Sequence, residues 1–523
     1  MTEAAPSKAA LQQVALVAVV AHATAIGAGF VWLDHAHIEE RLALAPAGSW
    51  FSLFTRPFAG TGFYRPLMAL SLSLDAAITN NPAFFHAVTL AWHAAAAVML
   101  VLAARRLGSS ARAATAAGLL FAAHPLTSLV ASAIAFRSEA MTLTFLLCLV
   151  VAHLAQKPLW AALALGAAAL SKETGWLLSP LFIAALELTR DDGEPRSVRL
   201  LASEAAAFTL CTALRLVYAP EHRASFPELT LDQNLGMRLG ALGKGLVQLV
   251  FPFSSPLCDA FPSLGVLSPL SLLGAAFLFL LLVSRVPSRR PLWLLLLALL
   301  PSLQLVPIMR WWSPHYFYVP FALGAVVLGD VIERRLENLR PALLLGLVVL
   351  ASLSLVQGLR YRDDVALWAP EVAREPACRE GHFYLGEAAR NAHDFPRAAL
   401  HYQRAIDGVA GHIAYLDEFA ALQNLGAVEL AMQHHREARL ALGKALERAS
   451  TPEESRHTTY DLALVALQAR EPSEAVRLLE PETELSEPLP QALLLRARAL
   501  HDLGREREAA HMLELAAATR GTR

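Results

Sequence analysis

The sequence is poor in cysteine and in charged residues. Four cysteines among 523 residues are too few and too scattered for a disulfide framework, and Cys148 and Cys211 lie in apolar runs where a thiol fills space. The sequence contains no closely spaced Cys and His residues of the kind that predicts a metal site. We expect neither a metal nor an organic cofactor. Charged residues make up only 17% of the chain and the net charge is −1, so the composition gives no support for nucleic-acid binding, and we expect no nucleic-acid partner.

Sequons for N-glycosylation are also absent, and lysine is rare beside arginine, which favours a bacterial source. What the sequence has in abundance is apolar residues, at 55% of the chain, as is typical of a polytopic membrane protein. Apolar runs recur from Leu11 to Leu355, whereas the last third is charged, Ala-rich and interrupted by Pro. We therefore predict an all-α protein with a membrane domain over residues 1–358 and a second domain over residues 359–523.

The apolar runs predict about 11 membrane-spanning helices. The first is too long for a signal-peptide core and lacks a small-residue cleavage site, so we expect an uncleaved helix. Segment 239–257 is expected to lie along the outer surface or to re-enter the membrane. The predicted spans are 11–33, 84–104, 112–124, 139–155, 159–171, 175–189, 200–218, 266–284, 291–308, 316–330 and 341–357.

Arginine and lysine predict the orientation of these spans. If the N-terminus is cytoplasmic, the basic loops "ARRLGSSAR", "QKP", "TRDDGEPRSVR", "SRVPSRR" and "IERRLENLR" all face the cytoplasm. An odd number of spans then places the C-terminal third outside, in the periplasm of a bacterial inner-membrane protein. Asp34, Arg65, Arg137 and Lys172 are predicted to share that outer face.

The C-terminal third contains an internal repeat. Ala463 and Ala497 are separated by the 34-residue period of tetratricopeptide repeats. The repeat predicts an α-solenoid that binds an extended peptide or another protein; the alternative is that it only packs on the membrane domain. The earlier copies share small residues at fixed offsets: Gly386, Ala398, Tyr402 and Ala405 recur as Gly426, Ala438, Leu442 and Ala445.

Several short segments together carry a family resemblance. They are "VWLDHAHI", "FYRPLMALS", "NNPAFFHAVTLAWH", "HPLTSLVASAIAFRSEA", "LSKETG", "HYFYVP" and "RDDVALW", in this order. With these motifs the chain resembles the TMTC-type transmembrane and tetratricopeptide-repeat O-mannosyltransferases and their bacterial relatives, in the GT-C superfamily of glycosyltransferases. The resemblance implies a GT-C-like membrane domain that transfers a sugar, which in the family is mannose. It also implies that the sugar donor is a polyisoprenyl phosphate, held in the lipid of the membrane. The acceptor it implies is a protein or peptide hydroxyl outside the cytoplasm.

Inverting sugar transfer needs a carboxylate to take the acceptor's proton and cations to hold the departing phosphate. We predict Asp34 as the catalytic base. Glu39 and Glu40 are the rival carboxylates, but they lie further into the loop, where a solvated charge needs no catalytic role. Donor-phosphate contacts are predicted for Arg65, Arg137 and Lys172. The alternative is that these cations snorkel or pair with Glu139 and Glu173.

Further side chains are predicted to line the site: His35, Tyr64, His86, His124, Glu139, Glu173, His315 and Tyr316. His35 is a candidate for tuning Asp34, although an exposed loop explains it equally well. For His86 and His124 the alternative is an interhelical hydrogen bond.

Two departures from the family pattern favour a different function. Leu33 occupies the place of the first family carboxylate, and Leu129 that of another. The alternative function is therefore a non-catalytic membrane scaffold whose repeats recruit protein partners. A transporter is disfavoured, because the polar groups are predicted at one face and not near the midplane.

Overall fold

The structure is a computed structural model that describes residues 6–190, 197–219, 229–253, 256–284, 289–304, 310–335, 340–485 and 488–520. These residues are helical apart from loops and two strands of two residues each, β1 (Phe261–Pro262) and β2 (His412–Ile413). The predicted all-α class is confirmed for this part of the chain. By its contacts the chain divides into two compact units, Met1–Leu367 and Trp368–Arg523.

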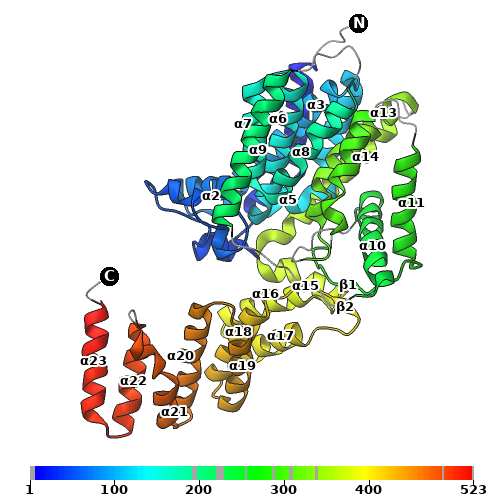
Figure 1. Ribbon diagram of the computed structural model, residues 1–523. Helices are drawn as coiled ribbons and strands as arrows, with labels where there is room; N and C mark the ends of the chain where they lie inside the picture. The colour runs from blue at the N-terminus through cyan, green and yellow to red at the C-terminus, as the bar shows by residue number, and fades with distance from the viewer. Residues whose placement is uncertain are drawn as a thin grey trace. The chain divides into compact units, whose positions relative to one another are not determined.

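The first unit is a bundle of helices (Figure 1). Proline stands at the start of α2, α3, α7 and α11, where its fixed φ suits a helix and its missing N–H costs no hydrogen bond. The helices are α1 (Lys8–Ala21), α2 (Pro66–Ile78), α3 (Pro82–Arg106), α4 (Ala111–Ala123), α5 (Ser128–Ser132), α6 (Arg137–Leu154), α7 (Pro158–Ser171), α8 (Glu173–Leu188), α9 (Val198–Tyr218), α10 (Leu231–Val250), α11 (Pro269–Val283), α12 (Arg289–Ala298), α13 (Tyr318–Arg335) and α14 (Arg340–Gly358).

Within the described ranges, five helical segments are long and apolar enough to cross a membrane, and a pair bent by 57°, α4 with Pro125–Ser132, makes up to six. Shorter apolar helices include α1, α7 and α11. These helices suggest a membrane protein, while the number of crossings stays a prediction. The five segments are Pro82–Arg106, Ile134–Leu154, Val198–Tyr218, Pro314–Arg334 and Pro341–Arg362.

Helix α6 lies at the centre of the first unit. The most apolar stretch of the segment that contains α6 is 83% buried inside the protein, whereas the corresponding stretches of the segments with α9 and α14 are each 17% buried. Outward-facing apolar side chains on α9 and α14 are what a lipid environment accommodates. The buried α6 begins at Arg137 and carries Glu139 in its first turn, so two predicted site residues start from the most enclosed helix.

The first helix is shorter than predicted. It ends at Ala21, and a 3₁₀ turn, η1 (Ala23–Gly27), continues the chain. The backbone then passes so close to Arg362 that a Cβ on Gly29 would lie 2.8 Å from its carbonyl oxygen. Glycine is therefore required at position 29, and the chain leaves the helix before the end of its apolar run.

Helices α10 and α11 also meet at glycines. A Cβ on Gly243 would lie 2.1 Å from the Leu270 carbonyl oxygen, and one on Gly274 would lie 1.9 Å from that of Leu239. Such close backbone packing is common between helices in membranes. The membrane placement of segment 239–257, most of which is the C-terminal half of α10, stays a prediction.

The second unit is made of successive helix pairs (Figure 1). A Cβ on Gly386 would lie 2.7 Å from the Tyr402 ring, and one on Gly426 would lie 2.5 Å from the Leu442 side chain. The repeated small residues thus receive a large side chain from the next helix. The helices are α15 (Asp364–Arg374), which crosses the unit boundary, and α16 (Arg379–Asn391), α17 (Phe395–Asp407), α18 (Glu418–Ala431), α19 (His435–Arg448), α20 (Pro452–Gln468), α21 (Pro472–Leu478), α22 (Pro490–Asp502) and α23 (Glu506–Arg520).

Three of the predicted basic loops lie partly outside the described residues, at 191–196, 285–288 and 336–339, as does part of the span predicted at 291–308. The predicted domains, residues 1–358 and 359–523, and the solenoid of tetratricopeptide-like repeats stay predictions.

Candidate active site

The segment that carries Asp34 has an unusual backbone. Trp32 has a φ of 58°, in the left-handed region that bulky side chains rarely adopt. Its N–H donates to Asp364 Oδ1 at 2.8 Å, and its ring is buried against Phe136 at a centroid distance of 4.9 Å. These contacts stabilise a conformation that the isolated segment would avoid.

Asp34 itself is fully buried. Its Oδ1 accepts the N–H of Ala135 at 2.8 Å and its Oδ2 accepts that of Val31 at 3.4 Å. Burial raises the pKa of Asp34 to about 7, although the two N–H groups favour the carboxylate. A carboxyl group with a pKa near neutrality can both take and return a proton at physiological pH.

His35 lies between two carboxylates. Its Nε2 is 2.7 Å from Asp364 Oδ2, and its Nδ1 contacts Glu39. The hydrogen bond to Asp364 raises the pKa of His35 to about 9, with Glu39 adding to it, so the ring is charged at neutral pH. The π-helical turn η2 (His35–Glu39) places His35 and Glu39 on one side, four residues apart.

His37 joins the Asp34 segment to the basic side chains. Its ring is buried and meets Phe58 edge-on at a centroid distance of 4.9 Å. Burial lowers the pKa of His37 to about 3, and the positive charges of Arg65 and Arg310 lower it further. His37 is therefore neutral, and the Phe58 ring that it meets is also approached by the Arg65 guanidinium, 5.8 Å from its centroid.

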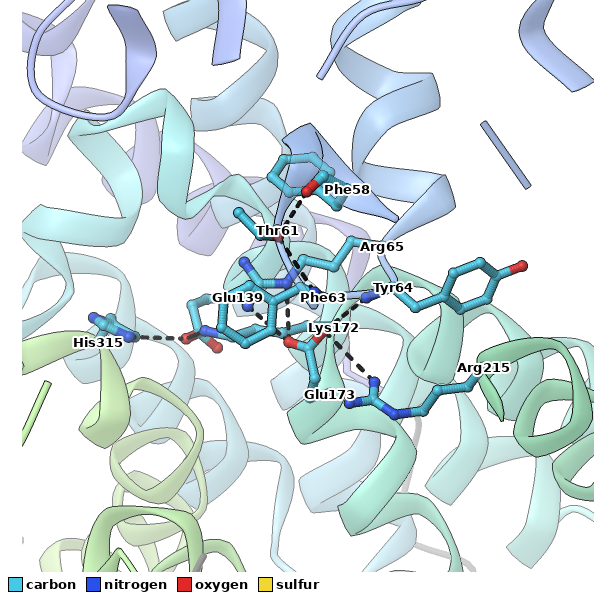
Figure 2. Close-up of polar contacts among 10 residues, drawn as sticks. All are labelled: Phe58, Thr61, Phe63, Tyr64, Arg65, Glu139, Lys172, Glu173, Arg215 and His315. Carbon is cyan, nitrogen blue, oxygen red and sulfur yellow. Dashed lines mark hydrogen bonds and ion pairs between the residues drawn. The ribbon is translucent and has the colours of Figure 1, made fainter. Parts of the chain in front are cut away.

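Glu173, at the start of α8, forms ion pairs with two arginines (Figure 2). Arg65 donates to its Oε2 through Nε at 2.9 Å and Nη2 at 2.7 Å, and Arg215 Nη1 lies 3.6 Å from its Oε1. The Arg65 guanidinium also lies over the Phe63 ring, 4.3 Å from the centroid. Arg65 is thus fixed on two sides while its side chain remains 15% exposed.

A second ion pair lies beside the first (Figure 2). Lys172 Nζ contacts Glu139 Oε1, and His315 Nε2 lies 3.8 Å from the same oxygen. Ser313 Oγ holds the other ring nitrogen of His315 at 2.6 Å. Arg65 stands at the N-cap position of α2 and Lys172 at that of α8. Backbone N–H groups point outward at a helix N-terminus, so these two helix ends and their cations favour an anion.

The third predicted phosphate ligand, Arg137, has a different environment. Its guanidinium is fully buried; Nη1 lies 2.6 Å from Asp75 and 2.9 Å from Ser71 Oγ. Nε donates to Thr89 Oγ1 at 3.0 Å and Nη2 to the Phe85 carbonyl at 2.7 Å. Arg137 thereby ties α6 to α2 and α3, and a phosphate would have to displace these partners.

The remaining predicted side chains make backbone contacts. His86 Nε2 is 3.0 Å from the Gly29 carbonyl and His124 Nε2 is 3.1 Å from that of Leu249. The Tyr64 hydroxyl donates to the Phe54 carbonyl at 2.8 Å, and that of Tyr316 to the Arg310 carbonyl at 3.0 Å. Tyr64 also offers its backbone N–H to Glu173 at 3.3 Å. These hydrogen bonds fix the orientation of the four side chains.

Two residues of this region were missed from the sequence. Asp364 belongs to the segment "RDDVALW". This segment is one of the motifs of the family resemblance, but the sequence predicts no role for its carboxylates. Arg310 precedes a Trp-Trp pair, and its guanidinium lies 5.2 Å from the centroid of the Trp32 ring. Among the described residues, no group of three or more His, Cys, Asp or Glu side chains is placed to hold a metal ion.

Comparison with known proteins gives one informative match. No family model matches the chain. A curated relative, Protein O-mannosyl-transferase Tmtc2 of Drosophila melanogaster, is 33% identical over 133 residues. The match covers 24% of this chain and 14% of that protein, so it spans a small part of the relative's length. It suggests a glycosyltransferase-like protein of the membrane.

Proposed function

We propose that the protein is a membrane glycosyltransferase. It moves a sugar, such as mannose, from a polyisoprenyl-phosphate donor to a protein hydroxyl outside the cytoplasm. The observation that carries the proposal is that the Phe58 ring lies between the two groups: His37 of the Asp34 segment meets it at a centroid distance of 4.9 Å, and the Arg65 guanidinium lies 5.8 Å from its centroid. The similarity to Tmtc2 supports the same chemistry.

Asp34 acts as the base in this proposal. As the acceptor oxygen forms its bond to the anomeric carbon, Asp34 takes the proton of the attacking hydroxyl. The bond between that carbon and the donor's phosphate oxygen breaks, and the oxygen leaves with the electron pair. A phosphate leaving group needs no protonation, so one carboxyl group with a pKa of about 7 is sufficient.

Arg65 and Lys172 hold the departing phosphate. Each is already paired with a glutamate, Glu173 or Glu139, which keeps the cation in place before the donor arrives. Preorganised cations stabilise developing negative charge without reorganisation during the reaction. Arg137 supports the site from behind, because its hydrogen bonds to Thr89 and Phe85 fix the start of α6.

The surrounding architecture is part of the same proposal. A GT-C-like bundle over residues 1–358 crosses a bacterial inner membrane about 11 times, with its N-terminus in the cytoplasm. The repeats over residues 359–523 form a tetratricopeptide-like solenoid in the periplasm and bind the protein acceptor. Alkaline phosphatase fused after residue 523 is then active, whereas an inactive fusion contradicts this orientation.

The decisive experiment is a transfer assay with the purified protein. A radiolabelled polyisoprenyl-phosphate mannose is incubated with the protein, and label is followed into protein acceptor and free sugar. We expect Asp34→Asn to lower transfer by about a hundredfold or more while donor binding persists. Glu40→Gln, in the same segment but exposed, is the matched control. Equal loss in both variants, or none in Asp34→Asn, contradicts Asp34 as the base.

The second candidate function is a non-catalytic membrane scaffold. Leu33 and Leu129 replace two carboxylates of the family pattern, and Leu129 is buried in the core. In that case the wild-type protein releases and transfers no label from any polyisoprenyl-phosphate sugar, yet its second unit still binds protein. The contact of Asp364 with Trp32 favours the enzyme, because it brings another carboxylate to the segment that contains Leu33.

A further inference from the structure

Helix α2 lies at one side of the first unit and has its apolar side outward (Figure 1). On the inward side, Ser73 Oγ accepts a backbone N–H at 3.0 Å, and Asp75 is buried in an ion pair with the arginine that begins α6. On the outward side, Leu74 is 42% exposed and Ile78 is 70% exposed. A helix that faces water has the opposite arrangement, with its apolar side against the core. The outward side of α2 therefore suits an apolar environment.

A loop beside α2 enlarges this surface. The 3₁₀ turn η3 (Trp50–Phe54) packs on α2, and its Phe51 is 80% exposed. We call residues 41–81 the α2 lobe; its sequence contains only one acidic residue, the one buried in the ion pair. The charged side chains classed as exposed in the lobe, Arg41 and Arg56, are both basic. Leucine and phenylalanine together with basic residues are typical of segments that lie at a membrane surface.

The helix that follows sets the level of this surface. Helix α3 begins at Pro82, shortly after α2 ends at Ile78, and it is one of the segments long enough to cross a membrane. Its other end is basic, at Arg105 and Arg106. The hydrocarbon core of a bilayer takes about 20 helical residues, and counting back from Arg105 by that number reaches the first turn of α3. The C-terminus of α2 therefore lies near the boundary between hydrocarbon and headgroups.

The surface of α3 continues the same character. Every side chain of α3 from Phe84 to Val98 that is not buried is apolar. The α2 lobe is also held against this helix, because its buried apolar side chains share one hydrophobic cluster with Phe85 of α3 and Met141 of α6. An apolar side of α2 is thus followed along the chain by an apolar side of a candidate membrane span.

We propose that the α2 lobe docks on the bilayer, with the outward side of α2 at the boundary between headgroups and acyl chains. A protein partner at this level would have to displace lipid that the neighbouring span already contacts. The placement requires that α3 crosses the membrane, and it is independent of the proposed sugar transfer. Because α2 begins directly after Arg65, a docked α2 would hold that guanidinium at the membrane surface.

The test is the depth of spin labels on the full-length protein in vesicles of phosphatidylcholine and phosphatidylglycerol. A nitroxide is attached to Leu74→Cys or to Ile78→Cys. Its collisions with oxygen, which concentrates in lipid, are compared with its collisions with a water-soluble nickel chelate. We expect both labels to favour oxygen and to lie about 5–10 Å into the boundary region. The native cysteines are buried or half-buried, so the unchanged protein, labelled in the same way, gives the background.

Three further labels calibrate the result. Leu440→Cys is the matched control, because Leu440 is a leucine of α19 in the second unit and is 59% exposed; its label should collide mainly with the nickel chelate. Leu210→Cys, in the apolar helix α9 and 61% exposed, gives the value for hydrocarbon. Phe51→Cys should resemble the two α2 labels, since η3 docks together with α2.

Other outcomes overturn the proposal. Labels on α2 that collide with the nickel chelate as readily as the label at position 440 would place the lobe in water. Shielding from both reagents would mean that protein covers α2, and shielding that persists with one copy per lipid disc would identify the cover as part of the same chain. A label at position 78 as deep as that at position 210 would mean that α2 belongs to a membrane span.

Discussion

At the scale of single residues, the protonation of Asp34 sets the pH range of the proposed reaction. A base must be deprotonated, and burial places the pKa of Asp34 at about 7. We therefore predict that kcat/KM for transfer rises with pH, by about tenfold per unit below pH 7, and levels off above it. Initial rates between pH 5 and 9 measure the profile. A rate already constant from pH 5 upward would assign the base to another group.

Asp364 is predicted to act through His35. The pKa of His35 is raised from 6.5 to about 9, so its contribution to stability is complete below pH 6.5 and is lost as pH rises through about 9. Asp364→Asn removes the main cause of the shift. We expect the thermal midpoint of the wild type to fall between pH 6.5 and 9 and that of the variant to fall less. Asp363→Asn, at the neighbouring and more exposed carboxylate, is the control.

The sequence identified side-chain types at this scale better than it identified their partners. Short motifs singled out Asp34, Arg65 and Lys172, and the structure buries Asp34 and pairs the two cations with glutamates, while their roles in sugar transfer stay predictions. The alternative pairings of Arg65 and Lys172 with Glu173 and Glu139 were also foreseen. The pairing of Arg137 with Asp75 joins two helices 62 residues apart, and no local pattern contains that information.

At the scale of elements, the helices α10 and α11 depend on close backbone approach. A side chain at Gly243 would meet the Leu270 carbonyl at 2.1 Å, and carbonyl groups of a helix cannot move aside cheaply. We predict that Gly243→Val separates the two helices and destabilises the protein by about 1–3 kcal/mol, as overpacking does. Fluorescence-detected size-exclusion chromatography after graded heating measures the loss.

The control for this variant is Gly346→Val in α14. No heavy atom lies within 4 Å of a Cβ placed there, so the substitution meets open space. We expect an unchanged profile for Gly346→Val. Equal destabilisation by both variants would mean that valine harms these helices through propensity and not through packing.

Apolar length predicted most helices of the first unit but not where they end. The span predicted at 84–104 is α3 (Pro82–Arg106), because Pro82 and the two arginines after the apolar run mark both ends. The span predicted at 11–33 stops at Ala21, because the chain must turn towards Arg362 at Gly29. Hydropathy carries no information about a contact more than 300 residues away in sequence.

At the scale of the whole molecule, the two compact units make a truncation experiment informative. Their boundary lies after Leu367, nine residues beyond the boundary predicted at 358. We expect a protein ending at Leu367 to fold, to bind the donor and to release sugar slowly to water, while transfer to protein acceptor falls. Retained transfer to protein would mean that the repeats are not needed for the acceptor; loss of donor binding would mean that they support the first unit.

The contact between Asp364 and Trp32 also bears on how the protein matures during synthesis. Residue 32 leaves the ribosome early, but the carboxylate that accepts its N–H follows the last apolar helix, α14. The strained segment beside Asp34 therefore acquires its partner only when every apolar helix has been made. A nascent chain is expected to remain chemically silent until insertion is complete, and a protein ending at residue 358 should be inactive towards donor even where one ending at 367 is not.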